Sequence, residues 1–264
     1  MIRNMSNALK VWILLTGTVR YEKIISTRNR GHGQWIEAPI LAYLIETPNG
    51  RILYDVGCDY RKLADPTLRT RYFDFMHPTI EAPRMQADQR IPHYLERLGL
   101  TPSDIDLVFI GHLHFDHAGG LHDLPGCEVH VHQDELAAAR SGLDGGIFAD
   151  ELANSNHWRL QAGEYELAPG IQAITTPGHT AGHMSLFIRL PKGRPVILCG
   201  DAADLNENLS DEIAPGCCWQ DNVEQALSSI RKLKSLALAE NAQLWPNHDM
   251  TFFRTLPEFP LWRD

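Results

Sequence analysis

Side chains that bind metal ions are packed into one short stretch of the chain, in the pattern His-x-His-x-Asp-His. His112 and His114 are two residues apart, so in an extended chain their side chains point the same way. Asp116 and His117 follow as the chain turns, and they can face a second point nearby. Imidazole and carboxylate groups are the usual ligands of zinc and related metals. The stretch therefore predicts halves of two adjacent metal sites.

The neighbours of this stretch favour a strand end over a solvated, histidine-rich loop. Residues 107–110 are apolar and predict a short buried strand. Gly119 and Gly120 follow, and glycine lets a backbone turn tightly. A polar loop remains the alternative, because short motifs also match by chance. Further ligand candidates downstream, which a loop would not require, favour the metal sites.

The stretch resembles the first metal motif of the metallo-β-lactamase superfamily, and later segments match the superfamily's other motifs in order. Within residues 176–183, the resemblance implies that His179 is a ligand. It implies that Asp201, at the end of a short apolar run, bridges both metal ions. His248 would be the last ligand. The resemblance covers nearly the whole chain.

The resemblance implies a dinuclear centre built from nitrogen and oxygen ligands. One ion would be held by His112, His114 and His179, the other by Asp116, His117 and His248, with Asp201 between them. Two divalent ions are expected, with zinc favoured, although such ligands also suit manganese, iron and cobalt. Bound metal lowers the pKa of water from about 15.7 to about 7. The expected reaction is attack of a bridging hydroxide on an ester-like carbonyl, with Asp116 passing a proton to the leaving alkoxide.

Within the superfamily, the chain is most similar to the quorum-quenching N-acyl-homoserine lactonase group. The similarity lies in residues 112–120, 177–187 and 225–233. It implies a hydrolase that opens the ring of a small-molecule lactone, with N-acyl homoserine lactones favoured. Lactones of the γ-butyrolactone or pyridoxolactone type and thioesters, as in glyoxalase II, are the alternative substrates. A metal-binding or sensing domain is the non-enzymatic alternative, and an open water position argues against it.

Asp204 departs from the pattern of this group. Well-known members place a tyrosine three residues after the bridging aspartate, where it can contact the substrate carbonyl. An ionised carboxylate at Asp204 would instead repel a developing oxyanion, and losing one donor typically costs about 2.7–4 kcal/mol. The metal ions, another side chain or a protonated Asp204 must then hold the oxyanion, or the substrate differs. Asp204 is therefore a candidate catalytic residue beside Asp116.

Residues 59–88 form a long, aromatic-rich segment with few regular signals. Such a segment is either a wall of the substrate pocket or an excursion that packs into the core. In the first case, the acyl chain would lie against Tyr72, Phe73, Phe75 and Met76. If the segment is exposed, it also favours a homodimer.

Strands and helices alternate along the chain and predict a single domain over residues 1–264. The expected architecture is a four-layer αββα sandwich with the metal site at the sheet edge. Strands are predicted at 11–19 and 23–27, and a hairpin at 40–46 and 51–56. The clearest helix spans 221–238, with Asp221 and Glu224 as a capping pair. Asp55, just after a strand, either supports the ligands or caps a turn.

Composition limits the partners and the compartment. The net charge of −9 gives no basic excess for binding phosphates, which argues against nucleic acid. The 5 cysteines show no disulfide framework, so reduced thiols in a cytoplasm are expected. The apolar run at 11–15 is too short for a membrane span and lacks an evident cleavage site. A soluble enzyme without a membrane partner is predicted.

Overall fold

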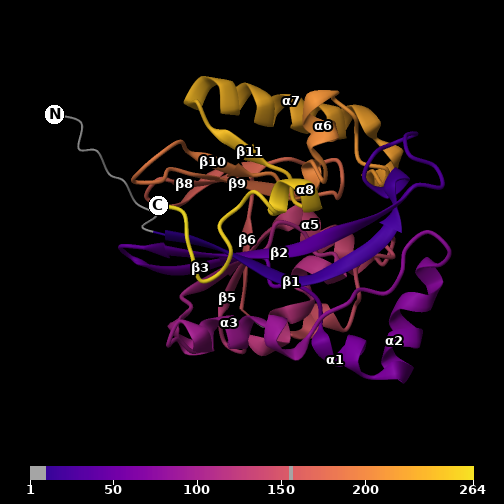
Figure 1. Cartoon of the computed structure of the whole chain (residues 1–264), viewed down its shortest axis with the longest axis horizontal. Coiled ribbons are helices and arrows are strands. Elements are labelled where there is room, and N and C mark those ends of the chain that lie inside the picture. The colour runs from indigo at the N-terminus through magenta and orange to yellow at the C-terminus, as the bar shows by residue number, and fades with distance from the viewer. Residues whose placement is uncertain (1–9, 155–156) are drawn as a thin grey trace.

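Two β-sheets packed face to face form the centre of the protein, a computed structural model that describes residues 10–154 and 157–264 (Figure 1). The six-stranded sheet has the order β1 (Lys10–Glu22), β2 (Trp35–Thr47), β3 (Gly50–Tyr54), β4 (Leu107–Phe109), β5 (Glu128–His132) and β6 (Trp158–Gln161). The five-stranded sheet has the order β11 (Gln243–Trp245), β10 (Val196–Leu198), β9 (Met184–Ile188), β8 (Ile171–Thr175) and β7 (Tyr165–Ala168).

Helices cover the outer face of each sheet. Figure 1 shows α6 and α7 above the five-stranded sheet, with α1, α2 and α3 below the six-stranded one. The helices are α1 (Tyr60–Ala64), α2 (Pro66–Phe73), α3 (Ile91–Arg97), α4 (Phe115–Ala118), α5 (Gln133–Ser141), α6 (Asn206–Ser210), α7 (Val223–Glu240) and α8 (Met250–Phe253). The predicted αββα sandwich is confirmed.

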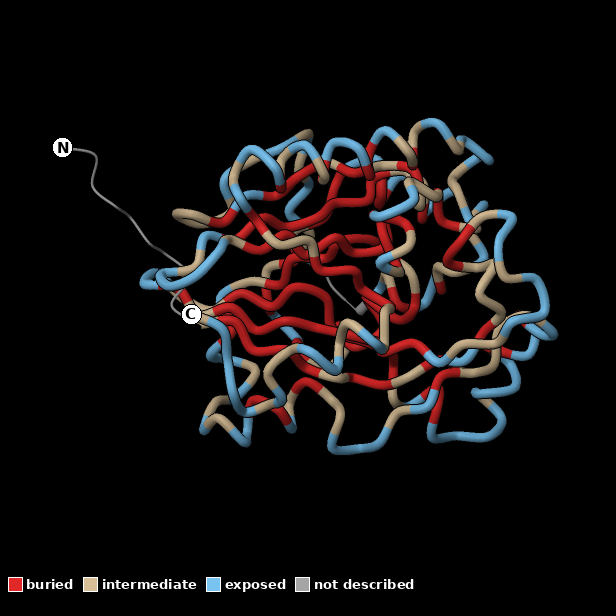
Figure 2. Tube along the Cα trace, turned by 45° about the horizontal axis from the view of Figure 1, so that its top comes forward, coloured by how far each residue is buried: buried red, intermediate tan, exposed pale blue. Residues whose placement is uncertain are grey.

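The strands bury both of their faces because successive side chains point to opposite sides of a sheet. On β2, Tyr43 and Ile45 pack between the two sheets, while Ala42 and Leu44 pack towards the outer helices. Trp245 of β11 joins the layer between the sheets. Figure 2 shows this buried interior running through the molecule, with exposed residues around it. Among the described residues, no helix is both long enough and apolar enough to cross a membrane.

Parallel pairing brings several strand ends to one edge. Strands β3, β4 and β5 are parallel neighbours in one sheet, and β10 pairs in parallel with β11 in the other. The two sheets touch at this edge, where the Met184 N–H donates to the Gly111 carbonyl oxygen at 2.8 Å. The loops that follow these strands therefore lie close together at this edge of the two sheets.

Two local predictions from the sequence are wrong. Residues 23–27 do not form a strand: β1 runs on to Glu22, and Lys23–Ile25 is a 3-10 turn whose Lys23 carbonyl accepts from Ser26 at 3.0 Å. The cap of α7 is Asn222, whose side chain accepts from the Gln225 N–H at 3.1 Å. Asp221 cannot play that role, because its side chain turns away to pair with Arg28.

Candidate metal centre

The loop after β4 carries the first metal-ligand candidates. His112 follows Gly111, and His114 immediately precedes α4, which carries Asp116 and His117. Gly111 is required for close packing, because a Cβ there would lie 2.8 Å from the Tyr54 hydroxyl. The glycines after α4 act in the same way, since a Cβ on Gly120 would lie 2.2 Å from the Val56 carbonyl oxygen. Close approach, not backbone freedom, explains these glycines.

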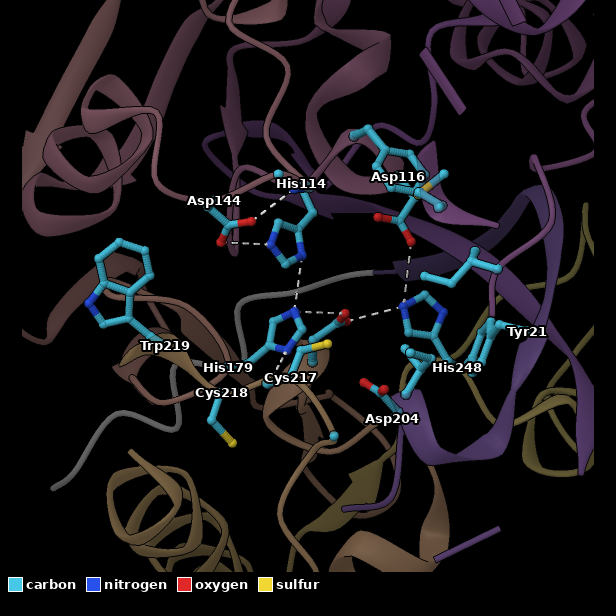
Figure 3. Close-up of a pocket in the computed structure, with 18 of the residues that line it drawn as sticks. Tyr21, His114, Asp116, Asp144, His179, Asp204, Cys217, Cys218, Trp219 and His248 are labelled. Atoms are coloured by element: carbon cyan, nitrogen blue, oxygen red, sulfur yellow. Dashed lines mark hydrogen bonds and ion pairs between the residues drawn. The ribbon is translucent and has the colours of Figure 1, made fainter. Parts of the chain in front are cut away.

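The structure brings the metal-ligand candidates into two adjacent groups. In each group the possible ligand atoms lie within 4.8 Å of one another. The first group contains His112, His114, His179 and Asp201, and the second contains Asp116, His117 and His248. Figure 3 shows His114 and His179 facing Asp116 and His248 across a gap. Residues far apart in the sequence thus form one centre.

Asp201 presents one carboxylate oxygen to each group. Its Oδ2 lies 3.5 Å from Nε2 of His179 and 3.7 Å from Nε2 of His112. Its Oδ1 lies 3.3 Å from Nε2 of His117 and 3.2 Å from Nε2 of His248. A carboxylate in this position has the geometry to bridge two cations.

The outward nitrogens of these histidines have fixed partners. Nδ1 of His248 lies 2.8 Å from the Pro39 carbonyl oxygen, and Nδ1 of His179 lies 3.3 Å from that of Cys217. Nε2 of His114 faces an oxygen of Asp144 at 3.1 Å, which leaves its Nδ1 towards the centre. Such contacts fix the tautomer and orientation of metal-binding histidines.

Unpartnered polar atoms test whether a metal ion fits this centre. Among the described residues, both ring nitrogens of His112 and Nε2 of His117 are buried without a hydrogen-bond partner. Buried polar atoms nearly always have partners, so these nitrogens are expected to bind something else. Imidazole nitrogens and carboxylate oxygens are ligands of divalent transition metals. The donor set therefore fits metal ions.

The sequence did not single out two residues that support the centre. The Glu135 carboxylate accepts the N–H groups of Leu113 at 2.9 Å and Gly182 at 2.8 Å, and so ties two ligand-bearing loops together. His183 accepts the Asp201 N–H at Nε2, 2.9 Å away, and burial lowers the pKa of His183 to about 3. His183 lies in a recognised motif, whereas Glu135 on α5 has no local signal that could have identified it.

Asp204 lies beside the centre and is only 3% exposed. Burial, and then the charge of Asp201, raise the pKa of Asp204 to about 8. Its backbone carbonyl accepts the His248 N–H at 2.9 Å, and its Oδ1 has no partner. Asp204 is therefore fixed next to the ligands, in a setting that disfavours a lone negative charge.

A cavity of about 630 Å³ opens beside the two groups. Its lining includes Asp116, Asp201 and Asp204, so the predicted catalytic candidates face it. Phe75 and Met76 also line this cavity. Tyr72 and Phe73, the other two residues predicted for the pocket, are not among the lining residues.

Tyr72 and Phe73 instead pack behind the cavity wall. The ring of Phe73 lies 5.5 Å from that of Phe115 and 5.6 Å from that of Phe148. The Tyr72 ring also contacts Phe148, at 5.1 Å. The aromatic segment is thus partly core and partly cavity wall, and a role of Phe75 and Met76 in binding substrate stays a prediction.

Comparison with known proteins gives consistent results. Residues 35–242 match the metallo-beta-lactamase superfamily. The chain is 34% identical to an N-acyl homoserine lactonase of a Bacillus species, covering 86% of this chain and 88% of that protein. It is 27% identical to the N-acyl homoserine lactonase AttM of Rhizobium radiobacter, covering 95% and 98%.

A solved structure is also similar over nearly the whole chain. It is an N-acyl homoserine lactone hydrolase with the product N-hexanoyl-L-homoserine bound at the catalytic metal center. The TM-score is 0.87 at 30% identity, and the match covers 97% of this chain and 99% of that one.

Proposed function

Since this chain belongs to the metallo-beta-lactamase superfamily and is related to the N-acyl homoserine lactonases, we propose that it opens the lactone ring of N-acyl homoserine lactones. It is a metal-dependent hydrolase, as its relatives are. One observation carries the proposal: Asp201 faces two ligand groups beside a cavity with apolar walls. The reaction would interrupt signalling by these lactones, which is quorum quenching.

The centre would hold two divalent ions, which we propose to be zinc. His112, His114 and His179 would hold one ion, and Asp116, His117 and His248 the other, with Asp201 shared. When bound, the ions polarise a carbonyl oxygen and make water a nucleophile at neutral pH. The protein fixes the ligands through outward contacts such as that of His117 with Asp55.

Asp116 would manage the proton of the reaction. Its carboxyl group lines the cavity and lies 3.7 Å from Nε2 of His248. A carboxyl group in this place can take a proton from the attacking water and pass it to the ring oxygen as the ester bond breaks. Opening the ring then yields a carboxylate and an alcohol on one product molecule.

The cavity would bind the acyl chain by its apolar side chains. Phe75 and Leu143 line the cavity yet remain 60% and 74% exposed, so a bound chain can cover them. Arg28 is the one arginine or lysine among the described lining residues, and it is paired with Asp221. The cavity therefore suits an apolar acyl group better than an anionic thioester.

Two further proposals concern the state of the protein. The five cysteines are all free, which fits a reducing cytoplasm. The exposed Phe75 and Leu143 favour a homodimer that covers part of this surface, and the molar mass in solution would test it.

The decisive experiment measures proton release from N-acyl homoserine lactones by the zinc-loaded protein. Fast release that disappears in a chelated sample supports the proposal. No release from a fully metallated sample would refute it. γ-Butyrolactone and a glutathione thioester, assayed in parallel, would then identify the other substrate classes.

A further inference from the structure

Asp204 shares an unusual property with two residues of the metal centre. Its Oδ1 is buried and has no hydrogen-bond partner. Ring nitrogens of His112 and His117, which are metal-ligand candidates, are also buried without a partner, as is the hydroxyl of Thr180. An unpartnered carboxylate oxygen in a buried site is costly, unless a proton or a cation neutralises it. Asp204 thus behaves like the ligands, although the family pattern gives it no such role.

The position of Asp204 also fits a ligand. The ligand atoms of Asp201, Asp204 and His248 lie within 4.8 Å of one another, which is the same spacing that defines the other two groups. Ligands of one zinc ion each lie about 2.0–2.2 Å from it, so the three side chains would close up around a bound ion. In Figure 3, Asp204 lies near the gap between His179 and His248.

A hydrogen-bonded shell holds the Asp204 carboxyl group in place. Ser26 is the hydroxyl group that contacts this carboxyl, and the Tyr21 hydroxyl lies 2.7 Å from Oγ of Ser26. Both are buried, and the Ser26 carbonyl accepts from the Asn208 side chain at 2.8 Å. Carboxylates that bind metals are usually supported by such contacts. Ser26 and Tyr21 are therefore positioning residues for Asp204.

We propose that Asp204 is an additional ligand of the metal ion held by Asp116, His117 and His248. The inference deepens the proposed function, because it concerns the same centre. The additional ligand would make the two metal sites chemically different. The first ion would have three imidazoles and one shared carboxylate, whereas the second would have two imidazoles and three carboxylates. Oxygen-rich sites favour harder cations, so the second site would accept manganese more readily than the first.

The test measures metal affinity in Asp204→Asn by competition with a chelator, using zinc and manganese as probes. The substitution keeps the size of the side chain and removes its charge. We expect one of the two ions to bind 10- to 100-fold more weakly, as for the loss of other groups that support a metal. Asp221→Asn is the matched control: Asp221 lines the same cavity but is exposed, and its affinities should equal those of the wild type. Metal affinities in Asp204→Asn that equal those of the wild type would overturn the proposal.

A second measurement covers the case in which Asp204→Asn does not fold. Ser26→Ala and Tyr21→Phe leave the carboxylate in place but remove its support, so each should weaken the same ion while the other ion is retained. The cobalt-substituted protein should also show a changed absorption spectrum in these variants. Unchanged affinity and spectrum in both would overturn the proposal.

Lactone hydrolysis by the wild type, assayed in parallel, separates this inference from the proposed function. Loss of metal affinity in Asp204→Asn without hydrolysis by the wild type would refute the function and keep the ligand. Hydrolysis by the wild type, with unchanged metal affinity in Asp204→Asn, would support the function and refute the ligand role of Asp204.

Discussion

Asp55 holds His117 in place: its Oδ2 lies 2.7 Å from Nδ1 of the imidazole. The other oxygen, Oδ1, accepts the Gly111 N–H at 2.8 Å, so one buried side chain orients both a ligand candidate and the loop that carries such candidates. Asp55 follows β3 and has a φ of 57°, which is uncommon for a residue other than glycine. The sequence left open whether Asp55 caps a turn or supports the ligands; its contacts are those of a support.

Asp55→Ala should therefore weaken metal binding without removing a ligand. His117 would lose the partner of its outward nitrogen, and the Gly111 N–H would lose its acceptor. Removing such a support typically lowers metal affinity 10- to 100-fold. Competition with a chelator measures this, and circular dichroism checks that the variant folds. Wild-type affinity in a folded variant would show that the contact with His117 is dispensable.

Asp201→Asn tests the bridge between the two groups. The amide retains one oxygen but loses the charge that faces His179 on one side and His248 on the other. We expect at least one metal ion to be lost and kcat/KM to fall by at least about tenfold. Metal content and hydrolysis should be measured on the same sample. A variant with two ions and full activity would show that Asp201 does not bridge.

Asp116→Asn tests the transfer of a proton to the leaving group. General acid catalysis contributes about 10²- to 10⁴-fold, so the kcat for an oxygen lactone should fall by that order. A thiolactone has a leaving group that needs little protonation, and its hydrolysis should fall much less. Equal losses for both substrates, at equal metal content, would assign Asp116 to metal binding alone.

Phe75→Ala should change acyl-chain preference. Phe75 lines the cavity. Fully burying an apolar side chain of this size contributes about 1.5–3 kcal/mol. Because a bound chain would cover Phe75 only in part, kcat/KM for a long-chain lactone should fall roughly tenfold, with little change for a short-chain one. The comparison uses homologous lactones of increasing chain length.

Phe73→Ala is the matched control for that experiment. Phe73 is 1% exposed and packs against Phe115 and Phe148 behind the wall. Its truncation should lower the free energy of unfolding by about 3–5 kcal/mol, as for other buried aromatic residues. Chain preference should stay the same. If instead Phe73→Ala altered the preference as strongly as Phe75→Ala, the assignment of the wall would be wrong.

His122 should make stability depend on pH. Burial alone would lower the pKa of His122, but Asp123, with its Oδ1 3.0 Å from Nε2, and then Asp59 raise it above the ordinary value. The folded protein thus holds this proton more tightly than the unfolded chain does. The resulting stability is fully present below about pH 6.5 and is lost as the pH rises through the raised pKa.

His122→Gln should therefore cost more stability at acidic than at alkaline pH. Denaturant unfolding of the wild type and the variant at pH 6 and pH 8.5 measures the difference. The wild type serves as the control at each pH, because the effects of other titrating groups cancel in the difference between the unfolding free energies of the two proteins. A loss that is equal at both values would show that the charge of His122 does not stabilise the fold.

Local patterns in the sequence were enough to predict much of the fold. Two runs joined by the turn residues Pro48, Asn49 and Gly50 predicted the hairpin of β2 and β3, and the helical stripe predicted α7. Both signals are local, since one depends on turn residues and the other on the period of the helix. The errors are the strand predicted at 23–27, where the structure has a 3-10 turn, and the cap of α7, where Asp221 pairs with the distant Arg28.

The metal-ligand candidates were also named from the sequence. Residue type and spacing indicated those of residues 112–117, and the resemblance to the superfamily implied His179, Asp201 and His248. The arrangement of these residues around Asp201 became visible only in the tertiary structure. Only the packing of two sheets places Asp201 between two groups, and only the fold brings Glu135 and Asp144 against the ligand-bearing loops. The same holds for the aromatic segment, where neighbouring residues diverge and Phe75 faces the cavity while Phe73 is buried. The sequence by itself thus determined the chemistry of this protein, since that depends on which side chains are present. Their contacts, burial and charge environment were decided by long-range packing, which no local pattern encodes.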